Sequence, residues 1–335
     1  MKLDDHPLLT EMRKAVEVDL KTTIQNSFPE SSRALEQMLE YHMGWIDNQA
    51  QGKRIRPLLL MLVHQIIAGD WKFIVEAGSA IEMIHNFSLI HDDIQDHSEV
   101  RHNRPTLWKQ VGVAQAINAG DALFTLGLKK LWDLAEAFDA NLVRKSYLIL
   151  NQTCLRLTQG QYLDLDFETR ALITVDDYLE MIGGKTSALL AACTQIGAVL
   201  AKAEPEVELA ALNYGMNLGL AFQLVDDDLG IWGSPEETGK SAASDLLDAK
   251  KSFPILWGLA TDNPFAHRWY RGPINPQEAA EVAVLLEATG ARQATHTKAD
   301  EYTRQALDSL AQFAGSSPEA ALLEDLTHWL LHREK

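Results

Sequence analysis

Apolar residues recur at helical spacing along almost the whole chain, and this periodicity limits what the chain can fold into. Apolar positions three and four residues apart lie on one face of a helix, whereas a half-buried strand needs strict alternation. No convincing alternating segment occurs among the 335 residues, so we expect an all-α fold. The predicted helices cover roughly residues 8–26, 30–49, 54–69, 71–95, 112–137, 139–168, 175–201, 206–229, 245–261, 276–290, 294–314 and 317–333.

The predicted helices follow one another without a clear domain boundary. The length of the chain would permit two domains or one large helical domain. The sequence contains no domain linker, low-complexity tract or short-period repeat. From about residue 262 onward it has a Pro/Gly-rich connection and amphipathic helices without a set of catalytic residue types, so we interpret this part as scaffold. We therefore predict a single all-α domain over residues 1–335.

The charge of the chain narrows the range of partners. Its 30 Lys and Arg residues and 47 Asp and Glu residues give a net charge of −17. A strongly acidic chain repels nucleic acids and anionic membrane surfaces, so we expect neither as a partner. Binding of phosphate groups is compatible with this charge if metal ions supply positive charge and the basic residues are concentrated at the site.

Cysteine usage and the lack of long apolar stretches predict a cytoplasmic protein. Cys154 and Cys193 both lie in helical apolar patterns, which is typical of reduced thiols in a core. The N-terminal residues 1–6 are polar and acidic and do not resemble the start of a signal peptide. The most apolar stretch, residues 188–201, is interrupted by polar residues and is too short for a membrane span.

Two aspartate clusters, each at the end of an apolar helical run, predict a metal site. They are residues 92–96 (Asp-Asp-Ile-Gln-Asp) and 226–228 (Asp-Asp-Asp). Asp92 and Asp96 are four residues apart and therefore lie on one helix face, where like charges cost a few tenths of a kcal/mol unless something neutralises them. Carboxylates on rigid helices suit hard divalent cations, Mg²⁺ in particular. If the two clusters face each other, they would hold metal ions and, through them, a diphosphate.

Basic residues flank both clusters in the sequence. Arg binds phosphate groups through a planar fork and Lys binds them as a point charge. Taken singly, a basic pair would be interpreted as part of a solvated surface, and His85 as a histidine of the core. Residues 226–228 alone would be the last turn of a helix, although the helix macrodipole disfavours anions there. The basic residues are Lys53, Arg54, Arg56, Arg101, Arg104, Lys185, Lys240, Lys250 and Lys251.

The order of these features resembles the trans-prenyl diphosphate synthase (polyprenyl synthetase) family, and geranylgeranyl diphosphate synthases in particular. The resemblance extends from residue 52 to residue 251, about 60% of the chain. The matching features are, in order, Gly52-Lys53-Arg54-Ile55-Arg56-Pro57, His85, Asp92-Asp93-Ile94-Gln95-Asp96, Arg101-His102, Lys185-Thr186, Phe222-Gln223, Asp226-Asp227-Asp228-Leu229-Gly230, Lys240 and Lys250.

The resemblance implies both a fold and an activity. The fold would be a single large bundle of antiparallel helices around a deep central cavity, as in isoprenoid synthases, assembled as a homodimer. The activity would be that of a prenyltransferase in isoprenoid biosynthesis, which condenses isopentenyl diphosphate head to tail (1′-4) with an allylic diphosphate. The implied cofactor is Mg²⁺, with about three ions per site when substrate is bound.

The resemblance also implies a role for each matching residue. Metal ions would bridge the allylic diphosphate, so that its C–O bond ionises and isopentenyl diphosphate attacks the resulting cation. The protein would position both substrates and exclude water. The resemblance implies that Mg²⁺ is bound by Asp92, Asp96 and Asp226, and that the allylic diphosphate is also contacted by Arg101, Lys185, Lys240 and Lys250. Isopentenyl diphosphate would be bound by Lys53, Arg56, His85 and His102. The electrostatic surroundings of the allylic cation would be shaped by Lys185, Thr186 and Gln223.

Three positions, in two motifs, depart from the family pattern. His102 stands where the family has a second Arg, followed by Asn103 in place of Gly, and Gly230 stands where the second cluster has a final Asp. The charge of His102 depends on pH, so we expect the affinity for isopentenyl diphosphate to depend on pH as well. Arg104 is a candidate to replace the missing cation. Because Asp226 and its neighbour Asp227 remain, we expect metal binding to persist despite Gly230.

Phe87 and Ser88 bear on the length of the product. In the family, a single aromatic residue five positions before the first cluster resembles enzymes that make the geranylgeranyl (C20) product, whereas two bulky residues resemble farnesyl (C15) enzymes. Here Phe87 is followed by the small Ser88, and we expect C20. The alternatives are a C15 product and a Phe87 that only packs in the helix core, with Met83 and Ile84 contributing to the cavity floor.

Three other functions agree less well with the sequence. A class I terpene cyclase normally has an Asn/Asp, Ser, Glu triad at four-residue steps, which the residues around Asp226 do not provide. A head-to-head synthase would not need Lys53, Arg56 and His85. A non-catalytic partner subunit that modulates another synthase would explain His102, but it would not need both aspartate clusters.

Overall fold

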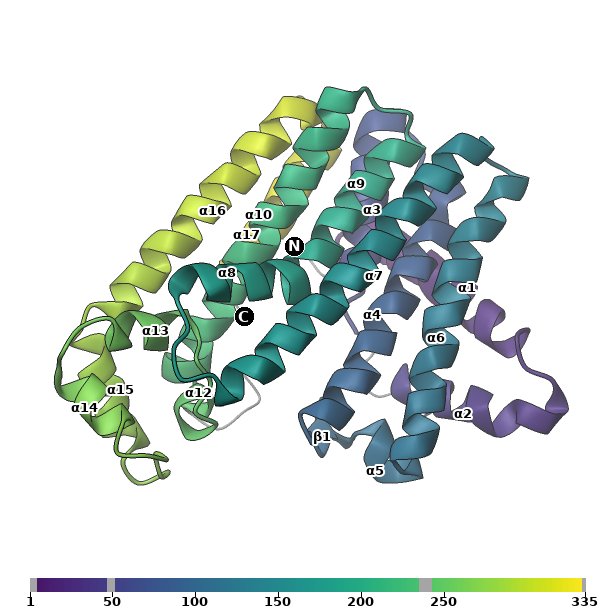
Figure 1. The fold of residues 1–335 in the computed structure, drawn as a ribbon. Coiled ribbons are helices and arrows are strands. Elements are labelled where there is room, and N and C mark those ends of the chain that lie inside the picture. Colours follow the sequence, from purple (N-terminus) through teal and green to yellow (C-terminus); the bar gives the residue numbers. More distant parts are fainter. Residues whose placement is uncertain (1–4, 47–51, 235–242, 333–335) are drawn as a thin grey trace. The chain divides into compact units, whose positions relative to one another are not determined.

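The computed structural model describes residues 5–46, 52–234 and 243–332, and these residues form an all-α fold, as predicted (Figure 1). Within these ranges the strands are limited to a short antiparallel hairpin of β1 (Val100–Arg101) and β2 (Arg104–Pro105). The α-helices are α1 (Pro7–Gln25), α2 (Arg33–His42), α3 (Ile55–Ala68), α4 (Val75–Gln95), α5 (Leu107–Val111), α6 (Val113–Asp133), α7 (Ala140–Thr169), α8 (Val175–Ile182), α9 (Ala188–Leu200), α10 (Pro205–Trp232), α12 (Ser244–Leu247), α13 (Phe253–Leu259), α14 (Pro264–Trp269), α15 (Ala279–Glu287), α16 (Ala291–Ala314) and α17 (Pro318–His332).

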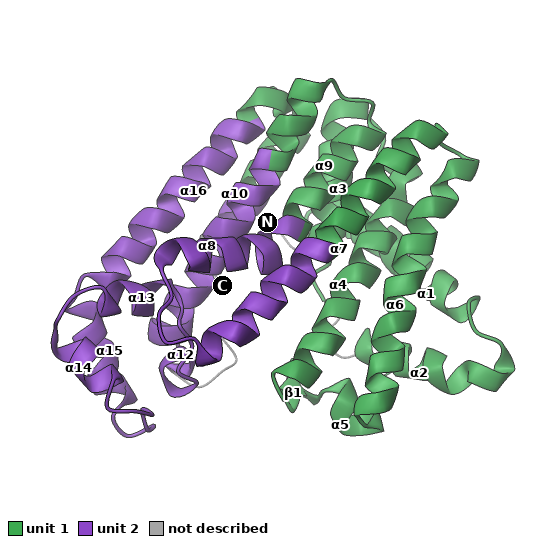
Figure 2. Cartoon of the chain, in the orientation of Figure 1, with its two compact units in different colours: residues 1–154, 189–212, 311–325 green, residues 155–188, 213–310, 326–335 purple. Residues whose placement is uncertain are grey.

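The chain divides into two compact units, each assembled from stretches that are distant in sequence (Figure 2). Unit 1 comprises Met1–Cys154, Leu189–Leu212 and Ala311–Asp325. Unit 2 comprises Leu155–Ala188, Asn213–Leu310 and Leu326–Lys335. The first aspartate cluster belongs to unit 1 and the second to unit 2.

Helix α4 is the centre of unit 1, where it packs against α1, α3 and α6. Its residues from Ala77 to Ile84 are all buried, and apart from Glu82, which pairs with Arg54, they are apolar or small. Helix α6 approaches α4 closely at Gly127, where an added Cβ would stand only 2.9 Å from the carbonyl oxygen of Ala80. This packing fixes the direction in which α4 presents its C-terminal aspartates.

Unit 2 is organised around α8, α10 and α13. Thr174 caps α8 through a capping box, in which its hydroxyl accepts from the Asp177 backbone N–H and the Asp177 carboxylate accepts from the Thr174 N–H. After α8 the chain forms one π-helical turn, Gly183–Ser187, before α9 begins. Wider turns of this kind are frequent at functional sites, and this one contains Lys185 and Thr186.

Several elements differ from the sequence-based predictions for local reasons. The segment predicted as one helix, 245–261, is two helices, and α13 begins with Pro254 in its first turn, where proline is tolerated. The predicted connection after residue 262 contains α14, capped by the Asn263 side chain, which accepts from the Ala266 backbone N–H at 2.9 Å. The predicted helix 175–201 is divided by the π-helical turn.

Both cysteines are buried and form no disulfide, in agreement with the interpretation as core thiols. Burial raises the pKa of each thiol to about 12, which keeps both protonated and unreactive. Among the residues that the structure describes, no helix combines the length and the apolar composition needed to cross a bilayer.

Candidate active site

A pocket of about 200 Å³ in unit 1 brings together the residues predicted to bind isopentenyl diphosphate. It lies between the end of α2, the start of α3, the middle of α4 and the β1–β2 hairpin. The residues of that prediction that line it are Lys53, Arg56, His85 and His102, and the pocket also contains Arg101, which was predicted to help with the allylic diphosphate. Residues up to 50 positions apart in sequence thus meet in one cavity that is rich in cations.

Arg56 and His85 form a hydrogen-bonded pair in this pocket. The Nη1 atom of Arg56 lies 3.0 Å from Nε2 of His85. Because a guanidinium can only donate, we assign the His85 proton to Nδ1 and the acceptor lone pair to Nε2. Burial and the adjacent Arg56 lower the pKa of His85 well below its usual value, so the imidazole is neutral. The Nε atom of Arg56 is buried without a hydrogen-bond partner among the described residues, which makes this guanidinium ready to bind an anion.

Arg54, the middle cation of the same motif, has a different role. Its Nε donates to Glu17 at 2.5 Å and its Nη1 donates to Glu82 at 2.9 Å. The guanidinium and the Glu82 carboxylate are almost fully buried, and the Arg54 backbone adopts a left-handed conformation with φ of 53°. The two carboxylates therefore hold Arg54 in place at the start of α3, and it supports the pocket wall between Lys53 and Arg56.

The hairpin supplies the second set of cations. Arg101 donates from Nε and Nη2 to the buried Asp93 carboxylate, both at 2.9 Å. His102 and Asn103 form the turn, both with positive φ (51° and 58°), the backbone conformation that a tight two-residue hairpin requires. Asn and His tolerate positive φ better than most residues, which explains how Asn103 replaces the family's Gly. Arg104 stacks on the Tyr41 ring at 4.4 Å and also lines the pocket.

The first aspartate cluster is divided into one buried aspartate and two more accessible ones. Asp93 points into unit 1 and is neutralised by Arg101, although burial raises its pKa. Asp92 is half-buried and Asp96 is exposed at the end of α4, where the Asp96 N–H donates to the Asp92 carbonyl at 2.8 Å. The pair predicted to bind a cation is thus separated from the aspartate that anchors the hairpin.

The second cluster, in unit 2, shows the same division. Asp227 is buried and accepts from the Tyr178 hydroxyl, from Gln223 Nε2 at 3.2 Å and from the Phe253 backbone N–H at 3.2 Å. Burial raises the pKa of Asp227 to about 7. Asp228 accepts from Arg292 Nε at 3.2 Å and pairs with His296 Nε2 at 3.0 Å. Asp226, the predicted metal ligand, is half-buried.

The remaining predicted residues of unit 2 form a connected polar network. The Thr186 hydroxyl donates to Gln223 Oε1 at 2.9 Å, and Gln223 in turn donates to Asp227. Lys185 pairs with Asp164, which comes from α7. The network therefore fixes the orientation of both the Gln223 amide and the Thr186 hydroxyl.

The two lysines after the second cluster have different surroundings, and a third lies outside the described residues. Lys250 has an exposed side chain, and the carboxylates of Asp245, Asp227, Asp164 and Asp226 raise its pKa against the effect of desolvation. The neighbouring Lys251 caps the end of α7 by donating to the carbonyl oxygens of Phe167 and Arg170, each at 2.7 Å. Lys240, predicted to bind substrate, lies outside the residues that the structure describes.

Several residues of the site had not been predicted from the sequence. Tyr178 and Asp164 belong to helices without a recognisable motif, and their partners are 49 and 21 residues away in the sequence. His42 and Asn86 line the unit 1 pocket but look like ordinary polar residues of a helix. A pattern based on neighbouring residues could not have revealed these contacts.

Gly230 leaves room for a carboxylate from another helix. A Cβ added at Gly230 would stand 2.6 Å from Oδ1 of Asp245, which α12 places there. We expect Gly230→Ala to displace this carboxylate and to lower the free energy of unfolding by about 1–3 kcal/mol. In a double-mutant cycle with Asp245→Ala, measured by urea unfolding, the two changes should be coupled by about 1 kcal/mol or more. Strictly additive losses would contradict this steric explanation.

The carboxylates fit Mg²⁺ if water and phosphate complete its coordination. Mg²⁺ usually keeps several waters and binds through one or two carboxylates plus substrate phosphates. Asp92 with Asp96 in unit 1, and Asp226 in unit 2, offer such limited sets of hard oxygen ligands at helix ends. Within the described part of the chain, no group of three or more His, Cys, Asp or Glu side chains is arranged as a metal cage.

Comparisons with known proteins identify the family of the chain. A family model described as polyprenyl synthetase matches residues 32–289. The (2E,6E)-farnesyl diphosphate synthase of Mycobacterium tuberculosis (strain ATCC 25618 / H37Rv) is 37% identical over 311 residues, covering 89% of this chain and 86% of that protein. The geranylgeranyl diphosphate synthase of the same strain is 34% identical over 317 residues, covering 89% of each chain.

The fold of the chain is similar to that of solved polyprenyl synthetase structures. The crystal structure of a polyprenyl synthetase from Streptomyces coelicolor A3(2) matches with a TM-score of 0.86 and 34% identity, covering 97% of this chain and 98% of that one. Similarity to synthases named for different products leaves the length of the product open. The chain belongs to the polyprenyl synthetase family and is a trans-prenyl diphosphate synthase, a prenyltransferase with the all-α isoprenoid synthase-like fold.

Proposed function

We propose that the protein catalyses the Mg²⁺-dependent head-to-tail condensation of isopentenyl diphosphate with an allylic diphosphate, with geranylgeranyl diphosphate as the main product. The observation that carries this proposal is the unit 1 pocket, in which the half-buried Arg56 has a buried Nε atom without a hydrogen-bond partner among the described residues and lies beside a neutral His85. A desolvated cation without a carboxylate partner is a strong site for a diphosphate. Lys53, Arg101 and His102 line the same cavity and add donors.

The residues proposed to take part in the reaction belong to both units. Mg²⁺ ions held by Asp92, Asp96 and Asp226 would neutralise the allylic diphosphate and make it a better leaving group. Lys185 and Lys250 add positive charge in unit 2. The allylic C–O bond breaks, the double bond of isopentenyl diphosphate forms the new C–C bond, and the released diphosphate accepts the proton that is lost.

The polar network of unit 2 suits the allylic cation. Because Thr186 donates its hydroxyl hydrogen to Gln223, its oxygen lone pairs remain directed elsewhere and can face positive charge. Gln223 is held in this orientation by its own donation to Asp227. Dipoles that are fixed before the reaction stabilise a developing charge without reorganising.

Incubation of the purified protein with Mg²⁺, isopentenyl diphosphate and each allylic primer (C5, C10 and C15) tests the proposal directly. A dominant C20 alcohol after dephosphorylation would support both the activity and the product length. A C15 product or chains longer than C20 would preserve the activity and contradict the assignment of C20. No elongation from any primer would favour the alternative of a non-catalytic partner subunit, especially if a second chain restored turnover.

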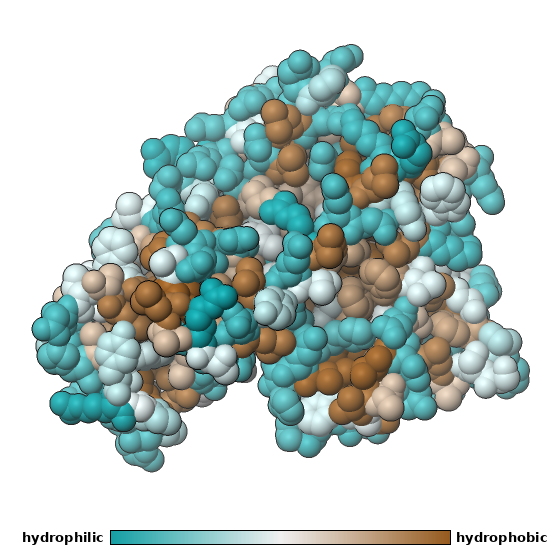
Figure 3. Space-filling view, in the orientation of Figure 1, coloured by the Kyte–Doolittle hydropathy of each residue, from teal (hydrophilic) through white to brown (hydrophobic). Residues whose placement is uncertain are grey.

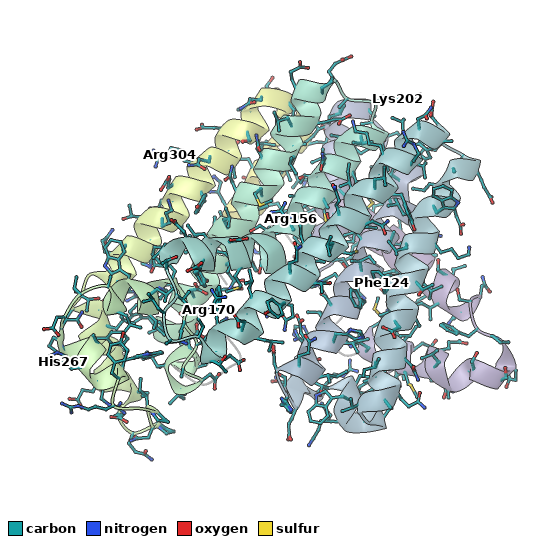
Figure 4. The ribbon with its side chains drawn as sticks, in the orientation of Figure 1. Phe124, Arg156, Arg170, Lys202, His267 and Arg304 are labelled. Atoms are coloured by element: carbon teal, nitrogen blue, oxygen red, sulfur yellow. The ribbon has the colours of Figure 1, made fainter. Side chains whose placement is uncertain are left out.

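Phe87 is the proposed determinant of product length. Its ring packs against His91 and against Phe124 of α6, with centroid distances of 5.0 Å in both pairs. Phe124 is labelled in Figure 4. We expect Phe87→Ala to open space beside α4 and to shift the main product beyond C20, and Ser88→Phe to shorten it to C15. Chromatographic sizing of the alcohols measures both shifts. If Phe87→Ala lowers stability but leaves the product distribution unchanged, the ring serves only in packing.

His102 is expected to make substrate affinity depend on pH. Burial and the nearby Arg101 lower the pKa of His102, so the imidazole is mainly neutral at pH 7 and gains charge only as the pH falls. The KM for isopentenyl diphosphate should therefore fall as the pH is lowered from about 8.5 to 6. His102→Arg should lower this KM and flatten its pH profile, because Arg remains charged throughout. An unchanged KM in the wild type over this range would contradict the role of His102.

We also propose a homodimer of a single prenyl synthase domain that spans residues 1–335. Helix α6 exposes apolar side chains at Val113 (46%) and Ile117 (41%), which are four residues apart and so share one face. Figure 3 shows apolar atoms at the surface over the helices of unit 1. A second copy would cover such a face. Sedimentation equilibrium of the wild type, compared with Ile117→Lys, measures the assembly.

A further inference from the structure

His42 is a polar group of the unit 1 pocket to which neither the family motif nor the proposed mechanism gives a role. It is the last residue of α2 and lines the pocket beside Tyr41 and Arg104. Its Nε2 atom is shielded from solvent and has no hydrogen-bond partner among the described residues. Buried polar atoms are almost always paired, so an imidazole nitrogen left unpaired at a cavity wall points to a ligand in the cavity.

The state of the imidazole follows from its neighbour on α4. The His42 side chain is hydrogen-bonded to Asn86. The amide nitrogen of Asn86 already donates to the carbonyl oxygen and the Oε1 atom of Glu82, at 2.8 and 3.0 Å. Its amide oxygen must therefore be the acceptor from His42, which places the imidazole proton on Nδ1 and leaves a lone pair on Nε2.

The charges around His42 keep it neutral in the empty pocket. Arg54 on α3 and Arg101 and Arg104 on the hairpin all face it, and together with burial they lower its pKa to about 3. The carboxylates at the same pocket, Glu82 and Asp93, are already paired with Arg54 and Arg101. The other titratable side chains that line it are His85, His102, Lys53, Arg56 and Tyr41. The pocket therefore carries an excess of positive charge until an anion enters.

We propose that His42 is a further diphosphate-binding residue of this pocket: when a diphosphate enters, His42 takes up one proton from solvent at Nε2 and donates it in a hydrogen bond to a diphosphate oxygen. The proposal rests on the proposed function, because it assigns the pocket to isopentenyl diphosphate. The entering anion reverses the local charge balance that had excluded the proton. His85 cannot act in this way, because its Nε2 already accepts from Arg56. Binding of isopentenyl diphosphate is then coupled to proton uptake.

Calorimetric titration of isopentenyl diphosphate into the full-length protein tests the coupling. The titration is done in EDTA, so that metal-dependent binding at the aspartates does not contribute. It is repeated near pH 7 in buffers that differ in protonation enthalpy, since the dependence of the observed heat on that enthalpy gives the number of protons taken up. We expect net uptake by the wild type.

Two substitutions separate the donor from its charge. His42→Asn keeps a polar group toward Asn86 and removes Nε2, and should lower affinity about 10-fold or more and reduce uptake by up to one proton. His42→Gln places a neutral donor near the position of Nε2, and should recover part of the affinity without the uptake. In turnover with Mg²⁺, both should raise the KM for isopentenyl diphosphate with little effect on kcat. His64→Asn, at a buried histidine of α3 outside the pocket, should leave binding and uptake unchanged.

The results separate this proposal from the proposed function. Equal affinity and equal proton uptake in the wild type and in folded His42→Asn and His42→Gln variants would overturn the role of His42, whether or not the enzyme elongates primers. Failure of the wild type to bind isopentenyl diphosphate in EDTA would also overturn it. A wild type that elongates no primer would contradict the proposed function, yet proton uptake lost with His42→Asn would still support the role of His42.

Discussion

Asp92→Asn is expected to lower the rate of prenyl elongation about 10³-fold, equivalent to about 4 kcal/mol of transition-state stabilisation. Asp93 is committed to Arg101, so Asp92 and Asp96 are the carboxylates of this cluster assigned to the metal. An amide in place of Asp92 keeps the shape of the side chain but removes the negative charge that attracts a divalent cation. Steady-state turnover with saturating isopentenyl diphosphate and primer measures the loss.

A binding experiment shows whether the loss comes from the metal. Mg²⁺ titrated calorimetrically in the presence of inorganic pyrophosphate should bind more weakly to Asp92→Asn than to the wild type. Asp133→Asn serves as a matched control, because Asp133 lies on α6 of the same unit and pairs only with the surface residue Lys129 in the described contacts. Turnover of Asp92→Asn close to that of the wild type would refute the assignment of the first cluster to the metal.

Arg54→Met is expected to lower the free energy of unfolding by about 3–5 kcal/mol. The change leaves Glu17 and Glu82 without their shared cation, and the Glu82 carboxylate is only 4% exposed. Removing one partner from a buried ionic network leaves an uncompensated charge, which costs more than the network contributes as a whole. Urea unfolding followed by circular dichroism measures the difference.

Two further variants distinguish a buried charge from a lost contact. The triple change Arg54→Met, Glu17→Gln and Glu82→Gln removes all three charges and should recover a large part of the stability. Arg33→Met breaks a surface pair with Glu30, in which both side chains are more than half exposed, and should change stability by less than about 0.5 kcal/mol. A loss below about 1 kcal/mol for Arg54→Met would show that the network is not essential to the fold.

The helical architecture could be predicted from the sequence because apolar spacing repeats within each helix. The prediction of helix boundaries was least accurate where the hydrogen bonding of a single turn changes from α-helical to π-helical. The π-helical turn at Gly183–Ser187 keeps a nearly helical pattern, so 175–201 reads as one helix. The hairpin at Val100–Pro105 contains too few strand residues to show alternation. The two-unit division is not visible in sequence either, because each unit draws on three distant stretches.

Residues of the candidate site could be predicted where they belong to a family motif. They could not be predicted where their role depends on a contact with a residue that is distant in the sequence. Lys53, Arg56 and His85 follow from their motifs, and the structure brings them to one pocket. The same motif does not indicate that Arg54 has a structural role while Lys53 and Arg56 line the pocket as candidate ligands. That role depends on Glu17 and Glu82, which lie 37 and 28 residues away in the sequence. For the same reason the sequence did not indicate His42, whose pKa is lowered by burial and by Arg101, Arg54 and Arg104, all distant from it in the sequence.

The pairing of Arg54 with Glu17 has a practical consequence for how this enzyme can be shortened. Glu17 lies on α1, which ends before the family-model match begins at residue 32. A fragment trimmed to the matched segment would retain every catalytic motif but would lose one of the two carboxylates that hold the start of α3. Protein expressed from such a trimmed gene should therefore be prone to degradation, although its motifs are intact. The first helix is better regarded as part of the minimal catalytic unit than as a dispensable extension.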